Sequence, residues 1–405
     1  MKILHTADWH MNSTLGRQNL SDLIVRALEA IAAYLEQFEV DVLVVAGDLF
    51  SERSRDEGMR EAISQIRRVF GPFVARGGRI VAIAGNHDSP LRFETLRDTL
   101  SLGAGEEANR FVLTSRPDFV VLKDKIGNPV QFALLPYPTP ANYLAGVTFG
   151  SLEEKNRLVQ KEFAAALQTM RDSHLNPAIP AVLVSHVHVR GANSHSLYQI
   201  SESDDVVFEP SQIAPDFAYA AYGHIHKPGE AVVGAPFIRY SGSPIPLDAA
   251  ERFDPKSVVL LEIGPNGERE MQILPLPRVA MEQITFDFVG NDVPEEIAKW
   301  RDTIENPAEV LLHYTVRYQP QKHNLGALRS EIDRVFPRWY NRAEEKVGLE
   351  LAPRPLELGA LSSSGENPLS GDVPALVRSY LDKRLAESAD REAVLKLAEE
   401  LLARR

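Results

Sequence analysis

Three short apolar runs near the start of the chain each end in polar side chains that can bind a metal ion. The runs and the residues that follow them are residues 2–7 before Asp8, residues 41–46 before Gly47-Asp48, and residues 79–84 before Gly85-Asn86-His87-Asp88. Apolar residues at helical spacing separate the runs, over residues 20–38 and 57–76. This alternation indicates an α/β fold with parallel strands that are buried on both faces and joined by helices. Because ligand sites in such sheets lie beyond the carboxyl ends of the strands, the polar ends are expected to meet in one site.

Two later apolar runs end in histidines. They are residues 181–185 before His186, and residues 217–221 shortly before Gly223-His224-Ile225-His226. His188 lies two residues after His186 and could reach the same side of the strand, so both histidines are candidates for one ligand position. We prefer His186 because it directly follows the apolar run.

Two pairs of candidate ligands have a spacing of two residues. In an extended segment the side chains of residues i and i+2 point to the same side. Asp8 and His10 are therefore expected to face one site together, and His224 and His226 are expected to do the same.

The candidate ligands comprise two carboxylates, one amide oxygen and at least four imidazoles. They are Asp8, His10, Asp48, Asn86, His186, His224 and His226. This mixture suits divalent manganese, iron or zinc and is a poor match for calcium. Seven ligands are too many for one catalytic ion that keeps an open position, so two ions that share one carboxylate are expected. Two such ions ~3.5–4 Å apart, with a local charge of about +2, would attract a phosphodiester and activate water.

Composition excludes several other classes of protein. The 405 residues include no cysteine, which rules out disulfides, thiolate zinc sites, iron–sulfur clusters and cysteine nucleophiles. A net charge of −12 argues against a protein that binds nucleic acid through bulk positive charge alone. The first apolar run breaks too early for a signal peptide, and no run reaches the ~18 apolar residues of a membrane span, so a cytoplasmic protein is expected.

Sequence patterns divide the chain into four expected parts. They are a main domain over residues 1–275, a small unit of alternating strands and helices over 276–345, a linker over 346–371 and a helical pair over 372–405. The linker is rich in Pro, Ser and Gly. The helical pair has apolar faces and balanced charge, which favours docking on a partner protein. A terminal hairpin that packs on its own domain is the alternative.

The polar clusters follow the pattern D-x-H, G-D, G-N-H-[DE], H and G-H-x-H, in that order, over roughly residues 1–250. This pattern resembles the calcineurin-like metallophosphoesterase family. The resemblance implies a metal-dependent phosphodiesterase whose β-sandwich is flanked by helices, with a small α+β capping domain and a C-terminal helical pair. By the same resemblance, one metal ion would be held by Asp8, His10, Asp48 and His226, and the other by Asp48, Asn86, His186 and His224.

The resemblance also implies a catalytic pair. His87 would stabilise the phosphate and protonate the leaving oxygen, and Asp88 would orient His87. The sequence departs from the family at two places. Residues 11–14 intervene before a Leu-Gly-Arg stretch, and Ser51 stands where some relatives have a second active-site histidine, so no proton transfer is assigned there.

Longer stretches are similar to the nuclease subunit of a bacterial complex related to the eukaryotic double-strand-break repair nuclease. They are residues 2–10, 46–50, 84–89, 222–228, 240–247 and 255–259. The similarity implies a double-strand exonuclease and single-strand or hairpin endonuclease that uses two Mn²⁺ ions in DNA repair, recombination and replication-fork processing. It also implies a homodimer within a heterotetramer, association with the nucleoid when on DNA, and an ATPase partner with a long coiled coil. The sequence contains no G-x-x-x-x-G-K-[ST] phosphate loop, so ATP would bind to the partner.

Two alternative functions remain open from the sequence. A phosphodiesterase of the same fold could act on small molecules such as cyclic nucleotides, because fold does not fix substrate. The chain could also be a scaffold that binds DNA ends and has lost its nuclease activity. The intact set of candidate ligands argues against such a scaffold.

Overall fold

The structure is a computed structural model that describes residues 1–51, 56–101, 110–144, 147–191, 206–209, 217–348 and 396. The chain divides into two compact units, residues 1–345 and 346–405. Nearly all of the second unit lies outside the described residues, as do most of the predicted linker and helical pair. Among the described helices, none combines the length and hydrophobicity that crossing a membrane requires.

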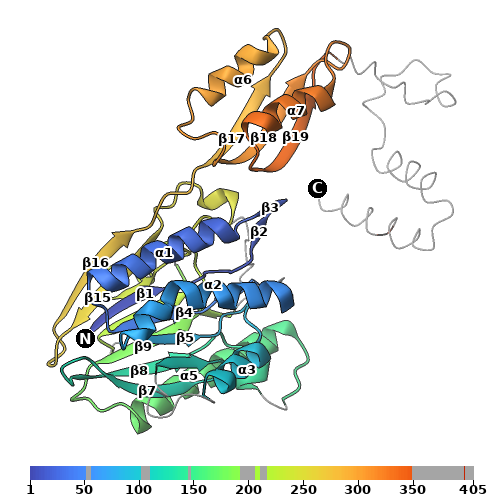
Figure 1. The fold of residues 1–405 in the computed structure, drawn as a ribbon. Coiled ribbons are helices and arrows are strands. Elements are labelled where there is room, and N and C mark those ends of the chain that lie inside the picture. Colours follow the sequence, from blue (N-terminus) through green and yellow to red (C-terminus); the bar gives the residue numbers. More distant parts are fainter. Residues whose placement is uncertain are drawn as a thin grey trace. The chain divides into compact units, whose positions relative to one another are not determined.

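One six-stranded sheet carries the first three apolar runs of the sequence (Figure 1). Its strands are β1 (Lys2–Thr6), β4 (Val42–Ala46), β5 (Arg79–Ile83), β6 (Phe111–Thr114), β15 (Ser257–Ile263) and β16 (Arg269–Pro275). Their order is β16-β15-β1-β4-β5-β6. The four strands from β1 to β6 run parallel, whereas β15 and β16 are antiparallel additions at one edge.

The second six-stranded sheet carries the apolar runs that end in histidines. Its strands are β7 (Asp118–Lys123), β8 (Pro129–Leu135), β9 (Ala181–His186), β12 (Tyr219–Gly223), β13 (Gly229–Glu230) and β14 (Ile238–Tyr240). Their order is β13-β14-β12-β9-β8-β7, with β8, β9, β12 and β14 parallel. Two short strand pairs lie outside both sheets: β2 (Thr14–Leu15) with β3 (Gln18–Asn19), and β10 (His188–Val189) with β11 (Val207–Phe208).

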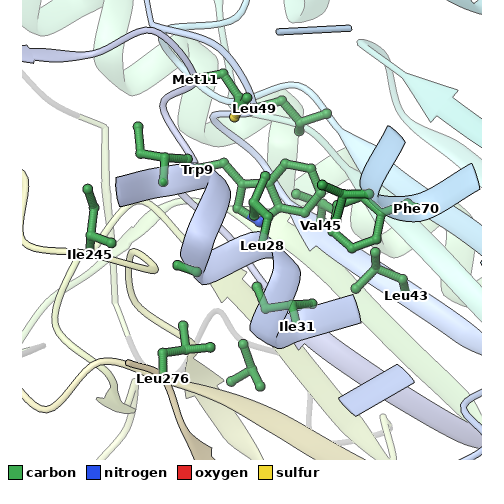
Figure 2. Close-up of a cluster of buried hydrophobic side chains, with 14 of the residues drawn as sticks. Trp9, Met11, Leu28, Ile31, Leu43, Val45, Leu49, Phe70, Ile245 and Leu276 are labelled. Carbon is green, nitrogen blue, oxygen red and sulfur yellow. The ribbon is translucent and has the colours of Figure 1, made fainter. Parts of the chain in front are cut away.

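Helices cover the outer faces of the two sheets (Figure 1). They are α1 (Ser21–Gln37), α2 (Asp56–Ala75), α3 (Pro90–Ser101), α4 (Pro140–Tyr143) and α5 (Leu152–Ser173). Buried side chains of α1 and α2 pack with Leu43 and Val45 of β4 (Figure 2). Val42, Val44 and the next alternate residue face the second sheet instead. β4 is therefore apolar at every position because each of its faces contributes to a different core.

A third, smaller sheet follows the two large ones in the chain. It contains β17 (Met281–Asp287), β18 (Leu311–Tyr318) and β19 (Trp339–Lys346), in that order, and it carries α6 (Val293–Arg301) and α7 (Leu325–Val335). Its core is aromatic, with Phe286, Phe288, Tyr314 and Phe336 fully buried. This sheet and its core account for the small α+β unit that the sequence pattern predicts, whereas its boundaries as a domain stay a prediction.

The small sheet contacts the segment between β1 and α1 and the start of α1. Arg338 donates to both carboxylate oxygens of Asp22, at 2.8 and 2.9 Å. The guanidinium of Arg17 stacks on the Trp339 ring at 4.1 Å, and Gln18 donates to the Trp339 carbonyl at 2.8 Å. The Leu-Gly-Arg stretch that follows the intervening residues 11–14 thus lies against β19 in this structure.

The α/β architecture of two stacked sheets flanked by helices confirms the predicted fold class. The sequence pattern missed α3 and the strands β6, β16 and β19. Strands β16 and β19 are mostly exposed along their length, so they lack the continuous apolar run that marked the buried strands.

Acid should destabilise the fold through a histidine buried between the sheets. His5 of β1 is fully buried, and its Nδ1 lies 2.9 Å from the Tyr219 hydroxyl. Its Nε2 has no hydrogen-bond partner among the described residues. Burial lowers the pKa of His5 to about 3 from an ordinary value of 6.5. Between these values only the unfolded chain binds the proton, so the free energy of unfolding falls as the pH drops below 6.5.

We expect His5 to cost about 2 kcal/mol of stability between pH 6.5 and pH 5, since each pH unit contributes at most ~1.4 kcal/mol. The double variant His5→Leu/Tyr219→Phe removes the titrating ring and its hydroxyl partner together, and it should lack this loss. Tyr219→Phe alone keeps the ring and serves as the control. Urea unfolding at both pH values measures the difference, and an equal loss in all three proteins would contradict the prediction.

Candidate metal centre

The predicted ligands follow the ends of five parallel strands, three in the first sheet and two in the second. β1 leads to Asp8 and His10, β4 to Asp48, β5 to Asn86, β9 ends at His186, and β12 leads to His224 and His226. β4 packs against β9 and β12 of the other sheet. The carboxyl ends of both sheets therefore meet, and the structure brings all seven side chains together there.

Asp48 lies at the middle of this group. Its Oδ2 is 3.3 Å from Nε2 of His10 and 3.4 Å from Nε2 of His186. Its Oδ1 accepts the backbone N–H of His87 at 2.9 Å. One oxygen of this buried carboxylate thus faces imidazoles that come from two different sheets, which is the arrangement that a shared ligand needs.

The other side chains gather on two sides of Asp48. On one side, Nε2 of His10 lies 3.2 Å from Nε2 of His226. On the other side, the Asn86 Oδ1 lies 3.0 Å from Nε2 of His186 and 3.1 Å from Nδ1 of His224. Three donor sets have ligand atoms within 4.8 Å of one another: Asp8 with His10 and His226, His10 with Asp48 and His87, and Asp8 with Asp48 and His186.

The chemistry of His186 fits a cation at this position. Its Nδ1 lies 2.7 Å from the backbone carbonyl of Ala46, so Nδ1 carries a proton and donates it. In a neutral ring Nε2 then presents a lone pair to two further acceptors, the oxygens of Asn86 and Asp48. Such an arrangement is favourable only with a positive charge between them, either a proton on Nε2 or a metal ion.

Charges in the centre shift the pKa values of its groups in opposite directions. Burial acts to lower the pKa of His186, but the adjacent Asp48 carboxylate outweighs it and raises the value to about 9. Burial also acts to raise the pKa of Asp48, and the neighbouring imidazoles of His186 and His10 overcome it, so that pKa lies far below its usual range. Asp48 is therefore ionised and retains a negative charge for a cation.

Glycines of the motifs make room for the ligands. A Cβ on Gly47 would lie 2.1 Å from Nδ1 of His186, and one on Gly85 would lie 2.1 Å from Oδ1 of Asp48. A Cβ on Gly223 would lie 2.0 Å from the carbonyl oxygen of Ala46. The G-D, G-N-H and G-H elements thus need glycine because the two sheets converge at that point.

We expect Gly47→Ala to weaken metal binding as well as the fold. Gly47 and Gly77 have nearly the same positive φ, 94° and 93°, but a Cβ on Gly77 would meet nothing within 4 Å. Gly77→Ala should therefore cost only the ~1–2 kcal/mol of a left-handed L-residue and leave Mn²⁺ binding unchanged. Gly47→Ala should cost more, because it also displaces His186. Urea unfolding and Mn²⁺ titration of the two variants test this, and indistinguishable variants would contradict it.

The backbone at the ligands is not extended, contrary to the expectation from their spacing. Asp8, His10, Asp48 and His224 have positive φ values of 53°, 44°, 52° and 92°. Each such residue costs on the order of 1–3 kcal/mol and persists only where surrounding contacts impose it. The N–H groups of Asp8 and His10 donate to the carbonyls of Gly47 and Asp48, both at 3.0 Å. Left-handed turns held by the neighbouring loop, rather than strand alternation, aim these side chains at one site.

The candidate catalytic residues lie in the loop after β5. The half-buried His87 ring packs against the His10 ring, with 5.0 Å between ring centroids. The Asp88 carboxylate accepts backbone N–H groups of Leu49 and Phe50 at 3.2 and 3.0 Å, and that of Gly85 at 2.9 Å. Asp88 thus ties the loop after β4 to the loop that carries His87. These contacts support an orienting effect of Asp88 on His87 that acts through the backbone.

Contacts favour His186 over His188 as the ligand after β9. His186 is fully buried and faces Asp48 and Asn86. His188 belongs to β10, and its ring centroid lies 6.1 Å from that of His224. We therefore keep His186 in the proposed ligand set.

Sequence reasoning missed a group of buried residues behind His226. Nδ1 of His226 lies 2.8 Å from the carboxylate of Glu251, which in turn accepts Nζ of Lys256 at 2.6 Å. Ser243 accepts from the same Nζ at 2.9 Å. Ser243 and Lys256 fall in the stretches 240–247 and 255–259, whose similarity to nuclease subunits was the available signal. Glu251 had no such signal.

Comparisons with known proteins agree with this geometry. The family model for the calcineurin-like phosphoesterase matches residues 1–228. The SbcD component of the SbcCD nuclease from Rhodobacter capsulatus is 29% identical to this chain, over 69% of the chain and 70% of the relative. Proteins of the same name from Bacillus subtilis (29% identity, 67% and 68% coverage) and Escherichia coli K12 (26% identity, 76% and 76% coverage) are also similar.

The match to the family model covers more than half of the chain. Its range, residues 1–228, includes all seven candidate ligands, from Asp8 to His226. The residues that could hold metal ions lie at the strand ends where the two sheets meet. The chain is thus a metal-dependent phosphoester hydrolase and belongs to the calcineurin-like phosphoesterase family.

Proposed function

We propose that the chain is the nuclease subunit of a DNA-processing complex, with double-strand exonuclease and single-strand or hairpin endonuclease activity. The observation that carries the proposal is the convergence of seven nitrogen and oxygen donors around Asp48. The choice of DNA as substrate is supported by three bacterial relatives whose names identify them as the SbcD component of the SbcCD nuclease. DNA repair, recombination and replication-fork processing are the corresponding processes.

The proposed cofactor is a pair of Mn²⁺ ions. Asp8, His10, Asp48 and His226 would hold one ion, and Asp48, Asn86, His186 and His224 would hold the other. The contacts described above divide in the same way, with His10 against His226 on one side and Asn86 against His186 and His224 on the other. When bound, the ions would neutralise phosphate charge and lower the pKa of an attacking water.

Protein side chains have distinct proposed roles in the reaction. His87 would donate a proton to the leaving oxygen, and its half-buried ring beside His10 leaves one part of it accessible to substrate. Asp88 holds the His87 loop in place through backbone N–H groups. Asp48 supplies fixed negative charge, and its Oδ1 also accepts the His87 N–H, so one carboxylate links the ligand cluster to the proposed acid.

The proposed partner is an SbcC-type ATPase with a coiled coil, within a heterotetramer that contains a homodimer of this chain. Residues 372–405 would dock on the partner, and residues 276–345 would form a capping domain beside the catalytic domain. The partner would bind ATP, and duplex ends or hairpins would be gripped by both proteins. These assignments come from the relatives' name and the predicted apolar faces of the C-terminal helices.

The test is cleavage of labelled duplex and hairpin DNA by the purified chain, alone and with the coiled-coil ATPase. Mn²⁺-dependent cutting that chelator abolishes is the expected result. Turnover of cyclic nucleotides without DNA cleavage would instead support a small-molecule phosphodiesterase. Binding of DNA ends in chelator, with no cutting in Mn²⁺ even when the partner is present, would support a scaffold.

A further inference from the structure

A buried ion pair lies directly behind His226. Glu251 and Lys256 are 1% and 7% exposed, and their charged atoms are 2.6 Å apart. Both belong to the segment between β14 and β15. A buried ion pair is weak evidence for a stabilising role, because removing two charges from water offsets much of their attraction. The position of this pair next to a candidate ligand therefore calls for a role other than stability.

The pair fixes the orientation of the His226 ring. Nδ1 of His226 lies 2.8 Å from Oε1 of Glu251. A carboxylate accepts hydrogen bonds only, so Nδ1 carries the proton and Nε2 of the neutral ring keeps its lone pair. Nε2 points to the candidate metal centre, 3.2 Å from Nε2 of His10. Glu251 thus selects the tautomer in which His226 can act as a ligand.

Lys256 holds both the carboxylate and the backbone of His226. Its Nζ donates to Oε2 of Glu251 at 2.6 Å, to Oγ of Ser243 at 2.9 Å and to the His226 carbonyl at 3.0 Å. These three bonds use all three protons of the ammonium group. The positive charge offsets the cost of burying the Glu251 carboxylate, and the bond to the carbonyl fixes the main chain from which the ring projects.

We propose that Glu251 and Lys256 are positioning residues that set the tautomer and orientation of His226 and thereby tune the affinity of one of the two metal ions. The inference rests on the metal centre of the proposed function. Carboxylates that accept the second N–H of a ligand histidine typically change metal affinity by about 10–100-fold when they are removed. The effect should be confined to the ion that His226 helps to hold.

A purely structural role makes a different prediction. Oε2 of Glu251 also lies 3.2 Å from Ser243 Oγ and 3.3 Å from the Leu247 N–H, so the network could serve only to close the loop. In that case a variant that keeps the shape of the loop would bind metal as the wild type does. Metal affinity and apo-protein stability, measured separately, distinguish the two roles.

The experiment is a calorimetric titration of metal-free full-length protein with Mn²⁺, together with thermal unfolding of the metal-free form. Glu251→Gln removes the charge with little change of shape, and Glu251→Gln/Lys256→Met removes both charges so that neither is left unpaired. We expect two Mn²⁺ ions in the wild type, and one site weakened by about 10–100-fold in both variants. His226→Ala should weaken the same site, which identifies it.

Tyr219→Phe is the matched control, because it removes the Nδ1 partner of His5, a buried histidine outside the ligand set. This variant should keep both Mn²⁺ affinities. Wild-type affinity at both sites in either Glu251 variant, or unfolding of both variants at all Mn²⁺ concentrations, would overturn the positioning role and leave the metal centre itself intact. A wild type that binds no Mn²⁺ would instead refute the metal centre.

Discussion

An Asp48→Ala variant is expected to bind neither Mn²⁺ ion and to lose nuclease activity altogether. Oδ2 of Asp48 faces both His10 and His186, which belong to the two proposed ligand sets. Without this carboxylate, each set loses its shared anionic ligand, and two cations would repel each other with no negative charge between them. Metal analysis after equilibrium dialysis measures the number of ions per chain.

Asp41→Ala is a suitable control for Asp48→Ala. Asp41 precedes the same strand, β4, and its carboxylate also accepts a backbone N–H, that of Lys2 at 2.8 Å. It lies at the opposite end of the strand from the ligands, so its loss should leave two ions bound. Two ions per chain in Asp48→Ala would show that Asp48 is not the shared ligand.

A His87→Ala variant is expected to keep both metal ions and to lose activity by roughly 10²–10⁴-fold, the usual effect of removing a positioned acid. The backbone N–H of His87, which Asp48 accepts, is retained by alanine. The loss should therefore come from the missing imidazole and not from a disturbed centre. Initial rates on labelled duplex, with Mn²⁺ stoichiometry measured in parallel, provide the test.

Added imidazole should restore part of the activity of His87→Ala if the ring supplies a proton. His174→Ala is the control, since it removes an exposed imidazole that stacks on Phe119 and is not among the candidate ligands. That variant should cut DNA at the wild-type rate and gain nothing from imidazole. Full activity of His87→Ala without imidazole would remove His87 from the mechanism.

Strand ends were predictable because burial on both faces leaves a strong mark in the sequence. β1, β4, β5, β9 and β12 are nearly continuous apolar runs, and the residues that follow them had to lie at one edge of a sheet. The motif glycines and the order of the clusters added the family. Edge strands such as β16 and β19 left no comparable mark, because only part of each contacts a core.

Backbone conformation was the part of the site that local spacing predicted wrongly. The i, i+2 argument assumed extended chain at Asp8 and His10, whereas both adopt positive φ. Contacts with Gly47 and Asp48 in the loop after β4 impose this conformation, and that loop is distant in sequence. Local pattern cannot register a conformation that distant residues enforce.

The sequence by itself determined which residues could bind metal ions and that they would follow buried parallel strands. Residue chemistry and hydrophobic pattern are local properties, so one chain is enough to read them. Only the tertiary structure decided that Asp48 lies between His10 and His186, and that Glu251 and Lys256 stand behind His226. Those relations depend on how two sheets stack and where one loop crosses them, and the packing of distant segments fixes both.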